Sequence, residues 1–134
     1  MKIDGACHCG HITYRAEILP DKVVVCHCTD CQTLSGSAYR TVAPVVDGSF
    51  ELLSGALKTY IKTAESGRKR AQSFCPECGS PIYAASDDDP PVKMGLRVGT
   101  IRQRNELHPV LQAWSRSAQS WTGDLDAIRK IDSQ

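Results

Sequence analysis

Seven cysteines, gathered into three tight groups, are the feature of this 134-residue sequence that most constrains its fold. The groups are CHC at 7–9, CHCTDC at 26–31 and CPEC at 75–78. An odd number of cysteines cannot form a fully paired disulfide framework. Cysteines separated by one or two residues have the spacing at which two thiolates bind one metal ion. We therefore expect zinc sites rather than disulfides.

The residues that follow the groups indicate how the seven thiolates divide. Gly10 follows the first group and Gly79 the third, whereas Gln32 follows the second. A knuckle that turns around a metal needs a residue tolerant of positive φ after its second ligand, and glycine supplies it. The first and third groups are therefore predicted to close together on one ion. The four ligands of this site are Cys7, Cys9, Cys75 and Cys78.

This four-cysteine site is expected to be structural, because four ligands close the tetrahedral shell of zinc. It also ties the N-terminus to the middle of the chain, so that metal binding contributes to folding, on the order of 10 kcal/mol by analogy with zinc fingers.

The other cysteines, Cys26, Cys28 and Cys31, form a compact triplet. A zinc ion with three protein ligands keeps one position open, which is typical of catalytic sites. Two alternatives stay open. A histidine can complete the shell, or Cys31 can be a buried, inert thiol. The histidines available are His8, His11, His27 and His108. We expect His8 and His27 to point away from the metal because each lies between two ligands.

Charge and hydropathy argue against nucleic-acid and membrane partners. The formal net charge is +1, which gives no general attraction to polyanions or anionic lipid. No segment approaches the ~20 apolar residues that span a bilayer, and the N-terminus lacks the apolar core of a signal peptide. A cytoplasmic location, where thiols stay reduced, is therefore expected. The one basic cluster, Arg68, Lys69 and Arg70, is interpreted as a solvated face, with phosphate or carboxylate binding as the alternative.

Short runs of β-forming residues between turns predict a mainly β single domain over residues 1–134 with little helix. The expected strands and apolar runs are 11–17, 22–26, 39–46, 50–53, 57–62, 70–74, 81–84, 92–98 and 111–114. A short helix at 29–35, capped by Thr29 or Asp30, is predicted to follow the triplet. A second short helix is expected at 124–131.

The cysteine groups together with their neighbours resemble a known family. The segments Gly5–Gly10, Cys26–Cys31 with Gly36, and Phe74–Ser80, in this order, are similar to the glutathione-dependent formaldehyde-activating enzyme family, which also includes centromere protein V. The tail Ala113–Trp121 is also similar to that family's C-terminal segment, although Gln112 stands where the family often has a histidine. The resemblance covers nearly the whole chain.

The resemblance implies a β-tent-type zinc fold with two zinc ions and a carbon–sulfur lyase activity like that of S-hydroxymethylglutathione synthase. It assigns the structural zinc to the four-cysteine group, and the catalytic zinc to Cys26, Cys28 and Cys31. It also implies a small-molecule thiol and an aldehyde as partners.

The chemistry of three thiolates agrees with that activity. Thiolates donate strongly to zinc and make a bound water harder to ionise, whereas a bound thiol is deprotonated outright. We therefore predict activation of a small thiol such as glutathione for reversible addition to formaldehyde or another small aldehyde. Tyr39, Arg40 and the basic cluster at 68–70 are candidates for holding the thiol's carboxylates. The alternatives are a non-catalytic zinc-ribbon-like module that binds protein or nucleic acid, and a redox protein whose triplet exchanges disulfides.

Overall fold

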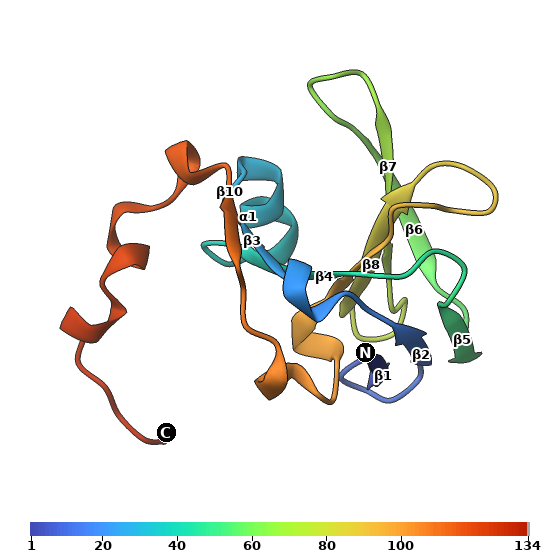
Figure 1. Cartoon of the computed structure of the whole chain (residues 1–134), viewed down its shortest axis with the longest axis horizontal. Coiled ribbons are helices and arrows are strands. Elements are labelled where there is room, and N and C mark those ends of the chain that lie inside the picture. Colours follow the sequence, from blue (N-terminus) through green and yellow to red (C-terminus); the bar gives the residue numbers. More distant parts are fainter. Residues whose placement is uncertain (134) are drawn as a thin grey trace.

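The computed structural model of the chain describes residues 1–133, which form two β-sheets and one α-helix (Figure 1). The strands are β1 Lys2–Ala6, β2 Thr13–Glu17, β3 Val24–Cys26, β4 Arg40–Pro44, β5 Glu51–Ser54, β6 Lys58–Thr63, β7 Lys69–Phe74, β8 Pro81–Ser86, β9 Gly95–Arg97 and β10 Leu111–Ala113. The helix α1 spans Thr29–Ser35. The mainly β fold with little helix, predicted from the sequence, is confirmed.

The strands belong to a three-stranded and a seven-stranded sheet. The small sheet has the antiparallel order β1-β2-β5, and the large sheet has the order β10-β3-β4-β9-β8-β7-β6. Neighbours in the large sheet are antiparallel except for β10 and β3, which run parallel. Buried and less buried residues alternate along β1 and β2, so that one face of the small sheet packs on the core.

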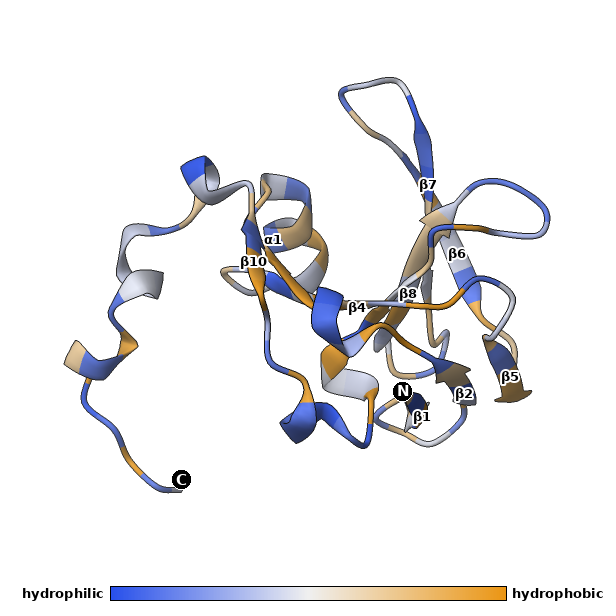
Figure 2. Cartoon of the chain, in the orientation of Figure 1, coloured by the Kyte–Doolittle hydropathy of each residue, from blue (hydrophilic) through white to orange (hydrophobic). Residues whose placement is uncertain are grey.

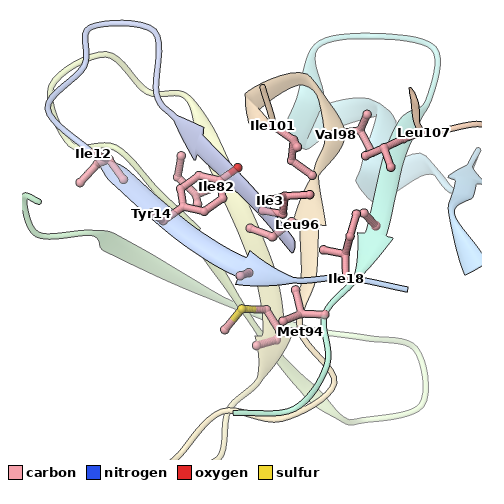
Figure 3. Close-up of a cluster of buried hydrophobic side chains, with 14 of the residues drawn as sticks. Ile3, Ile12, Tyr14, Ile18, Ile82, Met94, Leu96, Val98, Ile101 and Leu107 are labelled. Atoms are coloured by element: carbon pink, nitrogen blue, oxygen red, sulfur yellow. The ribbon is translucent and has the colours of Figure 1, made fainter. Parts of the chain in front are cut away.

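The hydrophobic core lies where the small sheet meets the centre of the large one (Figure 3). Tyr14 from β2, Ile82 from β8 and Leu96 from β9 are fully buried there. Cys7 and Cys75 belong to the same buried cluster. The core therefore reaches two of the four cysteines predicted to form the structural site, and any movement of that site disturbs core packing.

Most predicted strands are confirmed with small shifts at their ends, and β1 was not predicted. The expected strand at 92–98 shortens to β9, because Val98–Thr100 turns into a 3-10 helix. The strands expected at 70–74 and 81–84, on either side of the CPEC group, are confirmed as the antiparallel pair β7 and β8. None of the helices in residues 1–133 has both the length and the apolar character needed to cross a membrane.

The prediction of a second short helix at 124–131 is wrong. The chain instead makes 3-10 turns at Ser120–Gly123 and Leu125–Ala127 and is irregular beyond them. Figure 1 shows this segment running apart from both sheets, and Figure 2 shows hydrophobic and hydrophilic residues mixed along it. Ile128 and Ile131 are 50% and 62% exposed. Short helices need tertiary packing to persist in water, and this segment lacks it.

Candidate metal centres

The four-cysteine cluster joins two loops that are distant in sequence. Cys7 and Cys9 lie between β1 and β2, whereas Cys75 and Cys78 lie between β7 and β8. The four Sγ atoms all lie within 4.8 Å of one another. The Cys7 and Cys9 sulfurs are 3.5 Å apart, and the Cys9 and Cys75 sulfurs are 3.8 Å apart.

These distances fit a tetrahedral metal ion. A tetrahedron with Zn–S bonds of about 2.3 Å has S···S edges of about 3.8 Å. A disulfide would bring two sulfurs to about 2.05 Å, and all seven cysteines of the chain are free thiols. The cluster can therefore hold a metal ion, and the prediction that these four residues come together is confirmed.

The two loops are knuckles of the kind that the glycines predicted. Gly10 and Gly79 have φ angles of 80° and 74°, and their backbone N–H groups donate to the carbonyls of Cys7 and Cys75. Such a conformation is open to glycine at little cost. The loops also contact each other, because the N–H of His8 donates to the Ser80 hydroxyl at 3.1 Å.

Polar groups beside Cys7 and Cys78 favour the thiolate form at these two positions, where the pKa is lowered, whereas the pKa of Cys9 is raised. The backbone N–H of Ile12 donates to Cys7 Sγ at 3.2 Å, and Ser80 Oγ lies 3.2 Å from Cys78 Sγ. The Ser80 hydroxyl is the main cause that lowers the pKa of Cys78, to about 5, with help from backbone N–H groups. Hydrogen bonds to a charged group stabilise that charged form.

The triplet lies where β3 passes into α1. Cys26 ends β3, Cys28 is the N-cap of α1, and Cys31 is the third residue of the helix. Their three Sγ atoms lie within 4.8 Å of one another, so that this cluster can also hold a metal ion. The helix itself was predicted with its observed bounds, 29–35.

The prediction that Thr29 or Asp30 caps the helix is wrong. Cys28 Sγ accepts the backbone N–H of Cys31 at 3.3 Å. Thr29 is already helical, so the acceptor must come from the residue before it. One sulfur thus serves both as helix cap and as candidate ligand, which fixes Cys28 relative to Cys31.

Hydrogen bonding between two of the triplet thiols shifts their pKa values in opposite directions. The pKa of Cys26 is lowered to about 5, chiefly because the Cys31 thiol donates to it, and burial only partly opposes this shift. The same interaction raises the pKa of Cys31. This hydrogen bond therefore favours the thiolate at Cys26 over the thiolate at Cys31.

His27 points away from the triplet, as predicted. Its side chain is only 2% exposed and packs edge-on against the ring of Tyr39. Its Nε2 lies 2.9 Å from Gln112 Oε1, whereas Nδ1 has no hydrogen-bond partner among the described residues. An amide oxygen only accepts, so Nε2 carries the hydrogen.

The remaining histidines also stay out of the clusters. His8, His11 and His108 are exposed. Within residues 1–133 both clusters consist of cysteines alone, so the triplet has no histidine as fourth ligand. Cys31 is half-buried but lies within the triplet, which argues against the inert-thiol alternative.

Gln32 connects the triplet helix to the C-terminal segment, a role that the sequence did not reveal. Its Nε2 donates to the carbonyls of His27 at 2.7 Å and Ser117 at 2.9 Å. Gln119 Nε2 donates to Gln32 Oε1 at 3.2 Å. Ser117 and Gln119 lie 85 and 87 residues after Gln32, and only His27 is near it in sequence, 5 residues before. No local sequence pattern could therefore have identified the two distant partners.

The basic residues proposed for carboxylate binding separate in the structure. Arg40 is buried, and Tyr39 is half-buried against His27. Arg68 and Lys69 are exposed where β7 begins, at the hydrophilic turn of the β6–β7 hairpin (Figure 2). Arg70 is half-buried, and its Nη2 donates to the Lys93 carbonyl at 3.2 Å. Only Arg40 thus has the buried position that a specific ligand contact requires.

Comparisons with known proteins agree with the cysteine pattern. The family model described as Glutathione-dependent formaldehyde-activating enzyme matches residues 2–117. A crystal structure of a Rhodobacter sphaeroides protein has a TM-score of 0.63 and 21% sequence identity, with 82% of this chain and 99% of that chain covered. At that identity the likeness concerns the fold. No curated protein matches the chain.

Proposed function

This chain belongs to the glutathione-dependent formaldehyde-activating enzyme family, and from that premise we propose that it is a zinc-dependent enzyme of the carbon–sulfur lyase type. It activates a small, glutathione-like thiol for reversible addition to formaldehyde or another small aldehyde. The observation that carries the proposal is the triplet, in which three cysteine sulfurs converge and no fourth protein ligand joins them within residues 1–133.

The seven cysteines have two roles in this proposal. Cys7, Cys9, Cys75 and Cys78 hold a structural zinc ion that fastens the small sheet to the β7–β8 hairpin. The triplet holds the catalytic one. When bound there, zinc supplies the positive charge that keeps a substrate thiol deprotonated near neutral pH.

The chain's own residues position that chemistry. Cys28 caps α1, and Cys26 and Cys31 flank it, so that the open side of the triplet has a fixed direction. The hydrogen bond from His27 to Gln112 holds the turn between Cys26 and Cys28 against β10. A pre-organised site of this kind lowers the entropy cost of bringing thiol and aldehyde together.

The reaction is balanced without any further reagent. The sulfur of the thiol forms a bond to the carbonyl carbon, and the carbonyl π electrons move to oxygen. The proton that the thiol released ends on that oxygen, which gives an S-hydroxyalkyl adduct. The reverse reaction breaks the carbon–sulfur bond. Free thiols of this kind persist in a reducing compartment, so we also propose a cytoplasmic location.

Adduct formation tests the proposal. Zinc-loaded protein is mixed with glutathione and formaldehyde, and the hydroxymethyl signal is followed by NMR. We expect a rate above that of the spontaneous reaction, which Cys28→Ser abolishes while the circular dichroism spectrum is retained. A rate equal to the spontaneous one would reject the proposal. Salt-dependent binding of DNA or RNA in its place would support the binding-module alternative.

A further inference from the structure

Two arginines are buried beside the triplet without a carboxylate partner. Arg40 in β4 is 6% exposed, and Arg97 at the end of β9 is 7% exposed. None of the ion pairs within residues 1–133 includes either of them. A buried charge without a counter-charge is strongly unfavourable, so the burial of two like charges together requires an explanation.

Hydrogen bonds within the described chain do not supply the missing negative charge. Arg97 Nη2 donates to Gln72 Oε1 at 2.9 Å, and Arg40 Nη1 reaches the same oxygen at 3.4 Å. Arg40 Nη2 donates to the Leu34 carbonyl at 2.6 Å. The Nε atoms of both arginines have no partner among the described residues. Every acceptor that the pair reaches is therefore a neutral oxygen.

The strand pairing places both arginines on the side of the sheet that faces the triplet. Arg40 lies directly opposite Cys26 in the antiparallel pair of β3 and β4. Residues opposite each other in such a pair have Cα atoms about 5 Å apart and side chains on the same face. Arg97 lies opposite Val42, two residues after Arg40 in β4. Since alternate residues of a strand share a face, Arg97 is on the same face as Arg40.

The negative charges that act on the pair come from the triplet. Burial lowers the pKa of Arg40, and the charges of all three triplet cysteines oppose that shift. Burial and the positive charge of Arg40 lower the pKa of Arg97 to about 10, and the charges of Cys31 and Cys26 oppose this shift. The positive charge of Arg70 lowers the pKa of Arg97 further. Both buried arginines therefore stay charged at neutral pH beside the cysteine sulfurs.

The sum of the charges indicates which ligand the pair favours on a metal ion held by the triplet. Three thiolates and a divalent cation leave one negative charge, whereas the two arginines carry two positive ones. A neutral fourth ligand such as water leaves one positive charge unbalanced, but an anionic fourth ligand brings the sum to zero. Away from bulk water an unbalanced charge is much more costly than at the surface.

We propose that Arg40 and Arg97, linked by Gln72, are charge-compensating residues that select an anionic fourth ligand, such as a thiolate, on the metal ion of the triplet. The inference rests on the metal that the proposed function places there. The arginines act through space and do not touch the ligand, so the preference extends to any small anion that fits. The bond to the Leu34 carbonyl holds Arg40 against α1, so that its charge is in place before the ligand arrives.

Binding to the cobalt(II)-loaded protein tests the proposal, because the visible absorption of cobalt changes with its fourth ligand. The closed four-cysteine site has no position for a ligand, so difference spectra isolate the triplet. One probe is 2-mercaptoethanol, which has no carboxylate and binds as a thiolate. The other is imidazole, which binds as a neutral ligand.

The two probes should respond differently to loss of an arginine charge. We expect Arg40→Gln and Arg97→Gln each to weaken thiol binding at least about tenfold, since charges about 10 Å apart interact by that much at an effective dielectric constant near 20. Imidazole affinity should change less than about threefold. Arg40→Lys and Arg97→Lys keep the charge and should bind the thiol within about threefold of the unaltered protein. Arg15→Gln is the control, because Arg15 is exposed on the other sheet and pairs with Glu51.

Equal losses of thiol and imidazole affinity would show a merely structural role and overturn the proposal, as would unchanged thiol affinity in both glutamine variants. If these variants do not fold, the unaltered protein decides. Bromide should change its cobalt bands in a saturable manner, with perchlorate at the same ionic strength as control, and no change would overturn the proposal.

The outcomes separate this inference from the proposed function. If thiol binding depends on the arginines as expected but adduct formation is not accelerated, the proposed function fails and the charge-compensating pair stands. If adduct formation is accelerated while thiol affinity ignores the arginines, the proposed function stands and the pair fails.

Discussion

Replacing Gln112 tests whether the hydrogen bond to His27 positions the turn inside the triplet. Gln112→Leu removes the only acceptor that the described structure offers to His27 Nε2, whose other ring nitrogen already has no partner. Leaving a buried donor unpaired costs about 1–3 kcal/mol. Gln112 is itself exposed, so water can reach part of the site, and we expect about 1–2 kcal/mol.

Urea unfolding of the zinc-loaded protein measures this cost. With a denaturant slope of roughly 2 kcal/mol/M, the midpoint should fall by about 0.5–1 M. Gln112→His supplies a ring nitrogen as acceptor and should recover at least half of the loss. His27→Phe keeps an aromatic ring against Tyr39 and removes the donor, so that Gln112→Leu in this background should be nearly neutral.

The double-mutant cycle isolates the interaction from other effects of either change. The hydrogen-bond explanation requires a coupling energy of about 1 kcal/mol or more between His27 and Gln112. Additive effects within about 0.3 kcal/mol would refute it, and so would a stability in Gln112→Leu equal to that of the unaltered protein.

Two further predictions concern the core. Burial raises the pKa of Tyr14 to about 12, above the ordinary value near 10, so its stabilising contribution is complete below pH 10 and is lost as pH rises toward 12. At pH 11 about 1 kcal/mol should be gone; Tyr14→Phe should flatten the fall in urea midpoints between pH 9 and 11, and an unchanged slope would contradict this. Gly5→Ala would place its Cβ 2.3 Å from the Tyr14 ring and 2.6 Å from the Thr100 carbonyl oxygen, which should cost about 2 kcal/mol or more. Gly99→Ala meets nothing within 4 Å and serves as control; equal midpoints for the two variants would show that the contact is not tight.

The division of the cysteines could be predicted from the sequence because its cause is local. A knuckle that requires positive φ selects glycine at Gly10 and Gly79, and both adopt that conformation. The helix after the triplet could also be predicted from its local sequence. Its N-cap was not predicted, because the acceptor is the sulfur of Cys28 rather than a side-chain oxygen. The strands followed from short runs of β-forming residues between turns.

The surroundings of the triplet could not be predicted, because long-range pairing determines them. Arg40 and Arg97 meet only because β4 pairs with β9, and Gln72 reaches both from β7. The predicted terminal helix failed for a related reason. Its apolar residues, such as Ile128, find no partner surface within the described chain and stay exposed, so local propensity had nothing to reinforce it.

Metal content per chain tests the central claim most directly. Elemental analysis of purified protein should give two zinc ions per chain. Cys28→Ser should reduce this to one and keep the fold, whereas Cys75→Ser, which alters a fully buried core residue, should lose the structural ion and unfold. One zinc ion or none in the unaltered, folded protein, or two retained in Cys28→Ser, would contradict the account.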